Sequence, residues 1–183
     1  MEKFRVILIL RVRNVTIRQE MPADYGEVCR LIKASFATNA DDDGTVPDYL
    51  DELRVKDVFI PELSLIAEID NKIVGQIVLY KTDIKTPNGI LTELLLSPIS
   101  VHPDHFRRGI ARAMIEKSLE IALQMGYRAV FLCGDPEVYG KLGFSPSYDY
   151  GIFHKSDRGA EWSMVREVYE GALRGITGAI DTV

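Results

Sequence analysis

The sequence predicts an α/β fold of the mixed α+β type, with a mostly antiparallel twisted sheet that ends in one strand–helix–strand crossover. Three strand patterns separated by short turns, within residues 63–101, predict a meander. A long helix pattern over residues 109–125 and a short apolar strand over residues 128–133 follow it and predict the crossover. The chain has 183 residues, 46% of them hydrophobic, which suits one domain with a sizeable core.

The first elements of this domain read as a strand and two helices. Alternating side chains predict a strand over residues 15–20. Pro22 is a residue that starts helices well, and the helical spacing after it runs to about Phe36. The polar residues 39–44 predict a loop, and apolar residues within 49–53 predict a short second helix.

Residues 1–14 precede this pattern. Their apolar run is too short to span a membrane, and they lack the longer apolar region and small-residue cleavage site of a signal peptide. They are therefore interpreted as an N-terminal extension or an extra edge strand, ahead of a single domain over residues 15–183.

Pro98 interrupts the third strand of the meander, whose strands are predicted over residues 63–69, 73–84 and 90–101. Proline has no N–H to donate, so a central strand accepts it only at a bulge or where pairing ends. One interpretation is a plain edge strand. The other is a bulged strand that turns away from its next neighbour and leaves a slot with unpaired backbone groups; the apolar flanks favour this second interpretation.

The later part of the chain is predicted to hold a short helix and two further strands. The helix is expected over residues 136–142 and ends at Gly143, a natural stop. Strands are expected over residues 152–153 and 162–167. Residues 171–183 are interrupted by glycines and predict no clear element.

The junction between the third strand and the long helix, residues 101–112 (VHPDHFRRGIAR), predicts an anion site. Gly109 lets the backbone approach a ligand closely, and the free N–H groups and dipole of a helix N-terminus attract phosphate. Arg107, Arg108 and Arg112 surround this glycine. The alternatives are an ordinary loop glycine and solvated arginines.

Two motifs together resemble the GNAT superfamily of N-acetyltransferases. Residues 106–111 resemble its acyl-CoA-binding motif, Gln/Arg-x-x-Gly-x-Gly/Ala, and residues 139–144 (YGKLGF) resemble its Tyr-x-x-x-Gly-Phe signature. Residues 134–139 (GDPEVY) are similar to a poorly characterised bacterial branch of predicted N-acetyltransferases. Phe106 departs from the motif, which has Gln or Arg at that position.

The resemblance implies a GNAT-like fold that uses acetyl-CoA as co-substrate and transfers its acetyl group directly to a primary amine of a small molecule or peptide. It implies that Tyr139 is the general acid that protonates the CoA thiolate, where the alternative is a tyrosine packed on the core. It also implies contacts between the pantetheine and pyrophosphate of CoA and ten residues: Ile99, Ser100, Val101, Arg107, Arg108, Gly109, Ile110, Ala111, Arg112 and Asp135. Asp135 has a second interpretation, as the cap of the helix that carries Tyr139.

The general base and the acceptor site are less defined. Three carboxylates on or near predicted strands are candidates for the base, although an exposed strand carboxylate is the more ordinary interpretation of each: Glu20, Glu68 and Glu93. The acidic residues 39–44 either attract a cationic amine or form a solvated loop. Phe153, His154 and Trp162 either line the acceptor side or belong to the core.

Composition excludes several other classes of function. The chain has 22 Lys and Arg against 27 Asp and Glu, a net charge of −5, which argues against broad nucleic-acid binding. The three histidines and two cysteines have no metal-ligand spacing, so we expect no metal. Cys29 and Cys133 are expected to be buried free thiols of a cytoplasmic protein. Open sheet edges would permit a homodimer.

Two alternative functions remain at this stage. One is a non-catalytic acyl-CoA-binding sensor or interaction module, which Phe106 and the undefined base favour. The other is a nucleotide-binding domain, which is disfavoured because the chain has neither a Gly-x-x-x-x-Gly-Lys-Ser/Thr loop nor a Gly-x-Gly-x-x-Gly turn.

Overall fold

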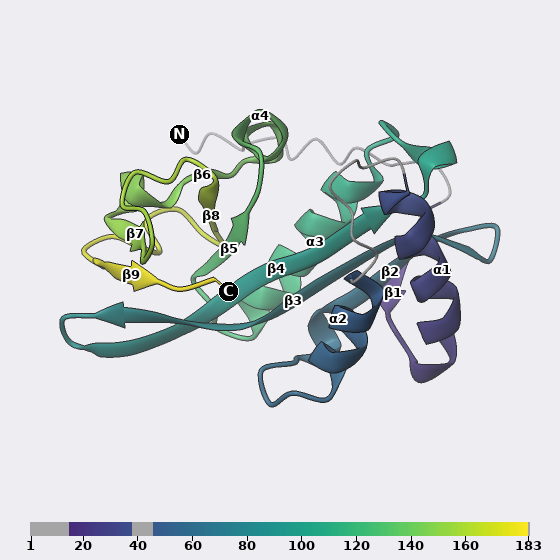
Figure 1. Ribbon diagram of the computed structural model, residues 1–183, viewed down its shortest axis with the longest axis horizontal. Helices are drawn as coiled ribbons and strands as arrows, with labels where there is room; N and C mark the ends of the chain where they lie inside the picture. The colour runs from purple at the N-terminus through teal and green to yellow at the C-terminus, as the bar shows by residue number, and fades with distance from the viewer. Residues whose placement is uncertain (1–14, 38–45, 183) are drawn as a thin grey trace, which may run out of the picture.

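The computed structural model describes residues 15–37 and 46–182, which form one nine-stranded sheet with helices on both faces (Figure 1). The main path of the sheet runs β1-β2-β3-β4-β5-β8-β6, and β9 and β7 join at the far part of β3. The strands are β1 (Thr16–Gln19), β2 (Ser64–Ile69), β3 (Lys72–Thr86), β4 (Gly89–Val101), β5 (Ala129–Cys133), β6 (Ser145–Pro146), β7 (Ile152–His154), β8 (Ser163–Glu167) and β9 (Gly178–Ile180). The α-helices are α1 (Tyr25–Phe36), α2 (Val46–Arg54), α3 (Ile110–Gln124) and α4 (Pro136–Tyr139).

This architecture confirms the predicted mixed fold and its element order. The meander is antiparallel, since β2 pairs with β3 and β3 with β4 in that sense. Asp70 and Asn71 form the first hairpin turn with φ of 49° and 62°, the backbone conformation that two-residue hairpin turns favour. The crossover is also present, because β4 and β5 are parallel and α3 connects them.

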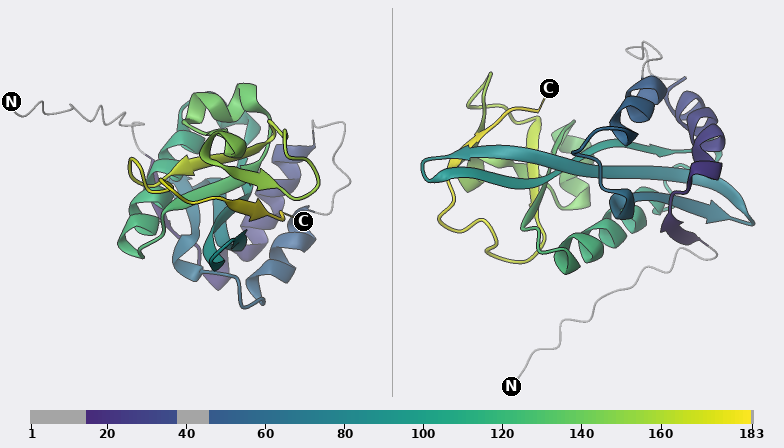
Figure 2. Two further views of the ribbon diagram at one scale, coloured as in Figure 1. Left: turned by 90° about the vertical axis from the view of Figure 1, so that its left-hand side faces the viewer. Right: turned by 90° about the horizontal axis from the view of Figure 1, so that it is seen from below.

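The two faces of the sheet are covered by different helices. Figure 2 shows α3 on one face and α1 with α2 on the other. Met114 and Ile115 of α3 pack on a core that includes Leu94 and Leu96 of β4. α3 lies so close to β3 that a Cβ on Gly75 would stand 3.0 Å from Met114. The sheet is therefore covered by helices on both faces.

Pro98 produces the bulge that the sequence predicts. The β3–β4 register runs from Ile77 opposite Ile99 to Leu79 opposite Leu96, so β4 contains one extra residue at this point. β4 pairs with β5 through Leu94 and Leu95. Within the described residues β4 has no further partner on this side, so β4 and β5 part beyond Leu95.

β7 and β8 confirm the strands predicted over residues 152–153 and 162–167, whereas the sequence did not predict β9 and β6. β9 pairs with Ile84 and Lys85 of β3, and β7 pairs with β9 in parallel, so the tail lies beside the far part of the β3–β4 hairpin (Figure 1). Gly178 is required there, because a Cβ at this residue would stand 2.6 Å from the carbonyl oxygen of Lys85. A three-residue strand among glycines gives no periodic signal, and β6 is shorter still.

The expectation of buried cysteines is wrong. Cys133 is exposed and Cys29 is half-buried. Cys133 is the last residue of β5, where alternation turns its side chain away from the α3 face that Leu132 occupies. Its Sγ lies 2.8 Å from Thr182 Oγ1.

Other expectations concern residues 1–14 and 39–44, which lie outside the described part of the chain. None of the helices in residues 15–37 and 46–182 has the length and apolarity that a membrane crossing requires. The same residues contain no group of three His, Cys, Asp or Glu side chains that could hold a metal ion.

Glu93 lies at the end of the β4–β5 pair where β5 begins, away from the end at which the two strands separate. Its side chain is 2% exposed, and Oε2 accepts hydrogen bonds from the N–H groups of Arg128 at 2.8 Å and Ala129 at 3.1 Å. Desolvation raises the pKa of this carboxyl, and the two backbone donors oppose that shift. Glu93 therefore satisfies the backbone where β5 begins.

Replacing Glu93 tests this role. Glu93→Leu leaves the buried N–H of Ala129 and the part-buried N–H of Arg128 without an acceptor, at a cost of about 1–3 kcal/mol for the buried group and less for the other. The free energy of unfolding in urea should therefore fall by about 2–4 kcal/mol. Glu93→Gln keeps an acceptor oxygen without the buried charge and should lose far less. Equal losses in the two variants would contradict the role.

Candidate active site

The slot beyond Leu95 exposes the backbone of β4 in an alternating pattern. Lys81 of β3 donates its N–H away from β4, to the carbonyl of Val58 at 2.9 Å. Because backbone groups alternate along a strand, the even-numbered residues of β3 near Lys81 direct their N–H and C=O groups toward β4. Ser100 lies opposite Gln76 and therefore pairs with β3. Ile99 and Val101, on either side of it, direct their N–H and C=O groups to the free edge. Two of the three predicted strand residues thus present backbone groups to the slot.

The backbone at the start of α3 has the conformation that the predicted anion site requires. Gly109 is the N-cap of α3 with a φ of 81°, and Arg107 also has a positive φ of 59°. Consecutive turns of this kind aim N–H groups into one concavity, and the first N–H groups of α3 have no acceptor inside the helix. Ile110, Ala111 and Arg112 supply these N–H groups. The site can hold phosphate by its backbone alone.

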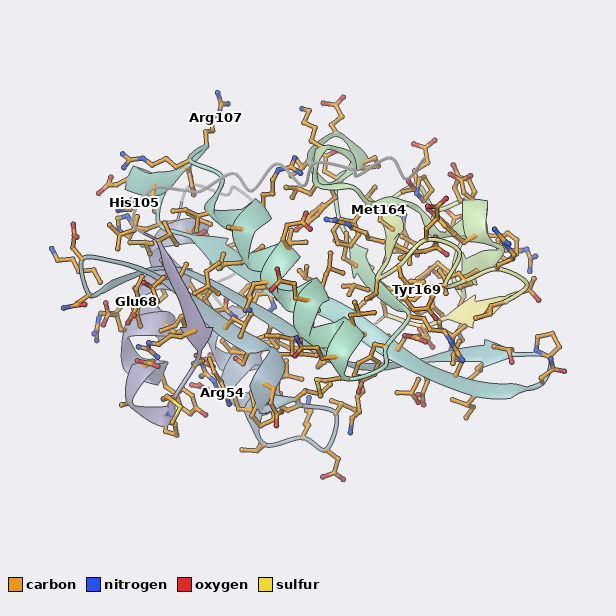
Figure 3. All side chains as sticks on the ribbon, turned by 180° about the vertical axis from the view of Figure 1, so that it is seen from behind. Arg54, Glu68, His105, Arg107, Met164 and Tyr169 are labelled. Carbon is orange, nitrogen blue, oxygen red and sulfur yellow. The ribbon has the colours of Figure 1, made fainter. Side chains whose placement is uncertain are left out.

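The side chains around the start of α3 are mostly exposed, and not all of them point toward the concavity. Arg107 and Arg108 are exposed, and Figure 3 shows Arg107 pointing out to solvent. Phe106, 47% exposed, occupies the motif position of Gln or Arg. Arg112 points elsewhere, since its guanidinium donates to the carbonyl oxygen of Lys141. Arg107 and Arg108 form no ion pair with any described residue, so their charge is the positive charge on this side of the described structure.

Tyr139 lies at the end of α4, next to the carboxyl end of β5. Its ring packs over Gly134, where a Cβ would stand 2.2 Å from a ring carbon, and meets Phe144 edge-on at 6.0 Å between centroids. Burial raises the pKa of its phenol above the ordinary value of 10.0. At neutral pH the raised pKa keeps this hydroxyl protonated, and the hydroxyl makes no hydrogen bond to any described residue.

Asp135 begins α4 as its N-cap. Its Oδ1 accepts the N–H of Glu137 at 2.8 Å, the capping interaction that was one of its two interpretations. Because β4 and β5 are parallel, their carboxyl ends meet at one edge of the sheet. The α3 concavity and Tyr139 therefore flank the same slot from the two strands that part there.

The three candidate bases are occupied by other groups. Glu20 is buried and accepts hydrogen bonds from Arg54 and, at 2.7 Å, from Ser64 Oγ. Glu68 pairs with Arg18 at 2.7 Å. Figure 3 places Arg54 and Glu68 toward the β1–β2 side of the molecule. The expectation of exposed strand carboxylates is wrong for Glu20, as it is for Glu93, because each satisfies buried donors.

A hollow of about 500 Å³ opens on the face of the sheet that α2 covers. Tyr49 of α2 donates a hydrogen bond of 2.7 Å to the hydroxyl of Tyr80 on β3, and burial raises the pKa of Tyr80 well above its usual range. Leu95, the last β4 residue paired with β5, also lines the hollow. The hollow therefore adjoins the point where the slot begins.

The C-terminal residues complete the wall of this hollow. Thr182 lines it and lies 3.1 Å from Nε2 of His154, which is buried and meets Trp162 edge-on at 4.5 Å. Phe153 is half-buried beneath the guanidinium of Arg158, 4.0 Å from its ring centre. Of the three aromatic residues expected on the acceptor side, His154 approaches the hollow through Thr182.

Sequence reasoning missed Gly134 and the Tyr49–Tyr80 pair. Gly134 precedes the capping Asp135, and nothing local signals that a ring will cover it. The two tyrosines are 31 residues apart, so no sequence pattern joins them.

A slot between parting parallel strands, an anion-binding helix start and a protonated tyrosine are the features of an acyl-CoA-dependent acyltransferase site. Comparison with known proteins gives the family. The family model described as "Acetyltransferase (GNAT) domain" matches residues 16–147, so the chain belongs to the GNAT acetyltransferase family. The resemblance inferred from the two motifs is thereby confirmed.

Relatives and solved structures agree with this assignment. The chain is 25% identical over 166 residues to the "Uncharacterized N-acetyltransferase YhbS" of Escherichia coli (strain K12), which covers 90% of this chain and 94% of YhbS. The structure of Escherichia coli YhbS in complex with CoA has a TM-score of 0.77 at 23% identity and covers 93% of this chain and 90% of that one. A GNAT family acetyltransferase from Brucella melitensis in complex with acetyl-CoA has a TM-score of 0.62 at 28% identity and covers 71% and 82%.

A methyl group at Gly134 tests the placement of Tyr139. Gly134→Ala should displace the ring and lower stability by about 1–3 kcal/mol, the usual cost of overpacking. Gly140→Ala is the matched control, because a Cβ there meets nothing within 4 Å. Thermal unfolding of both variants checks the prediction, and equal melting temperatures would contradict it.

Proposed function

We propose that this protein is an N-acetyltransferase that moves an acetyl group from acetyl-CoA to a primary amine by direct attack. The observation that carries the proposal is the common edge at which the slot, the α3 concavity and Tyr139 meet. CoA is the ligand in the Escherichia coli YhbS structure, and acetyl-CoA in the Brucella melitensis structure. Both belong to proteins of this fold, which supports the same co-substrate here.

The chain's own residues supply the binding. Ile99 and Val101 pair with the amide-rich pantetheine arm as with an added strand, while the first N–H groups of α3 hold the pyrophosphate. Gly109 permits the close approach, and Arg107 and Arg108 add positive charge. Backbone N–H donors beside the thioester also stabilise the charge that develops on its carbonyl oxygen.

Tyr139 acts as the general acid. The acceptor nitrogen forms its bond to the acetyl carbon as the carbon–sulfur bond breaks, and Tyr139 donates its phenolic proton to the leaving sulfur. Its raised pKa keeps that proton in place at neutral pH. Direct transfer requires no nucleophilic side chain.

The hollow beneath α2 is the entrance proposed for the acceptor. It adjoins the slot at Leu95, and the hydroxyls of Tyr49 and Tyr80 can orient an amine there. The acceptor is a small molecule or a peptide with a primary amine. Glu20, Glu68 and Glu93 are not assigned as its base, because each already satisfies other donors.

A non-catalytic acyl-CoA sensor is the second candidate. Phe106 in place of the motif's Gln or Arg favours it, together with the occupied carboxylates. Such a protein would bind CoA and turn over no amine, so the following two experiments separate the candidates.

Binding is tested by a thermal-shift titration with acetyl-CoA, CoA and ATP. A ligand at a hundred times its Kd adds about 2.7 kcal/mol, or a few degrees in Tm. Acetyl-CoA and CoA should both raise the melting temperature of wild type, and neither should raise that of Gly109→Glu. Gly126→Glu is the control, because Gly126 at the other end of α3 has a similar φ of 85°. No shift of folded wild type by either CoA species would contradict the proposal.

The acid is tested by Tyr139→Phe with acetyl-CoA and a panel of primary amines. Loss of a general acid lowers kcat by about 10²–10⁴-fold, while the affinity for CoA should be kept. Because the phenol's pKa is raised above 10.0, wild type should show no alkaline fall in rate from this group below that pH. An unchanged kcat in Tyr139→Phe would rule out the acid role.

A further inference from the structure

Tyr139 is held by a short segment that cannot order itself. α4 has only four residues and runs into a single 3₁₀ turn, Gly140–Leu142. Helices this short are unstable alone, and the carbonyl groups at their ends need donors. Gly134 and Phe144 contact the Tyr139 ring, and the backbone of the turn that follows it is held by other elements.

Arg166 of β8 holds that turn from one side. Its Nη1 donates to the carbonyl oxygen of Leu142 at 2.9 Å and to Glu116 Oε1 of α3 at 2.8 Å, and its Nη2 donates to Glu116 Oε2 at 3.0 Å. The guanidinium lies over Gly143, where a Cβ would stand 3.2 Å from Nε. One planar group thus joins β8, α3 and the Tyr139 turn.

Arg112 of α3 also holds this turn. It belongs to the first turn of α3, the turn that forms the anion site, and it donates to the carbonyl oxygen of Lys141. Two successive carbonyl groups, those of Lys141 and Leu142, are therefore bound by arginines from different elements. Both arginines tie the turn to α3.

We propose that Arg166 is a positioning residue for acetyl transfer, which fixes the Tyr139 hydroxyl relative to the anion site of α3 by clamping the intervening turn. This inference rests on the function proposed above. The charge of Arg166 is neutralised by Glu116, so its role is geometric. A lysine offers a point charge and cannot serve the same three oxygens in fixed directions.

The test uses two variants of the clamp and one control. Arg166→Lys keeps the positive charge but loses the planar guanidinium with its two donor nitrogens. Glu116→Gln keeps Arg166 and weakens the contact that holds its guanidinium. Arg174→Lys is the control, because Arg174 is exposed and makes no ion pair with any described residue. Thermal unfolding verifies that all three are folded.

The first readout is spectroscopic and needs no acceptor. All eight tyrosines are labelled as 3-fluorotyrosine, and the Tyr139 resonance is assigned by its loss in Tyr139→Phe. Arg166→Lys should move and broaden this ¹⁹F resonance, Glu116→Gln should do so less, and Arg174→Lys should leave it in place. An unmoved Tyr139 resonance in both clamp variants would overturn the proposal.

The second readout is kinetic, with acetyl-CoA and the best amine of the panel. Misplacing a catalytic group by about 1 Å costs about 10²-fold, so Arg166→Lys should lower kcat by about 10–100-fold with little change in the KM for acetyl-CoA. In a Tyr139→Phe background the same substitution should cost almost nothing. If Arg166→Lys lowers kcat as much in the Tyr139→Phe background as in wild type, the clamp proposal is overturned. If Tyr139→Phe alone leaves kcat unchanged, the acid role is rejected, and the ¹⁹F spectrum then decides whether Arg166 positions Tyr139.

Discussion

The parting of β4 from β5 is the constraint on which the rest of the site depends. A parallel pair would normally continue to the ends of both strands, and here it stops at Leu95 opposite Phe131. The extra residue at Pro98 redirects β4, and β3 holds the redirected segment through Gln76 and Ser100. Backbone groups of Ile99 and Val101 are left facing open space, and unpaired backbone groups favour a ligand that pairs as a strand does.

The same parting explains why the helices at this edge are short or capped by glycine. α3 begins after a left-handed turn at Gly109, which leaves the first N–H groups of the helix without acceptors inside it. α4 must leave β5 at Gly134 with no Cβ in the way of the Tyr139 ring. Since α4 has four residues, arginines from α3 and β8 take over the ordering that a longer helix would provide itself. The turn that follows Tyr139 is thus tied to α3 directly by Arg112 and through Glu116 by Arg166.

The sequence predicted the parts of this arrangement that are local. Pro98 indicated the bulge, Gly109 the start of α3 and Gly143 the end of the segment that carries Tyr139, because each depends on a residue's own backbone. The acid role of Tyr139 stays a prediction. It did not predict contacts between distant residues. Arg166 and Glu116 are 50 residues apart, Glu93 reaches Arg128 across 35, and the β9 pairing depends on a glycine fitting against Lys85. Cys133 was misjudged because an apolar run does not reveal which face of its last residue is covered.

The most direct test of the slot is amide hydrogen exchange by NMR, residue by residue along β4, with and without saturating CoA. The amides of Ile99 and Val101 face the slot and should exchange more slowly when CoA is bound. The amide of Ser100, which already pairs with β3, should not change. Equal protection of all three amides, or protection of none while CoA is bound, would contradict the account.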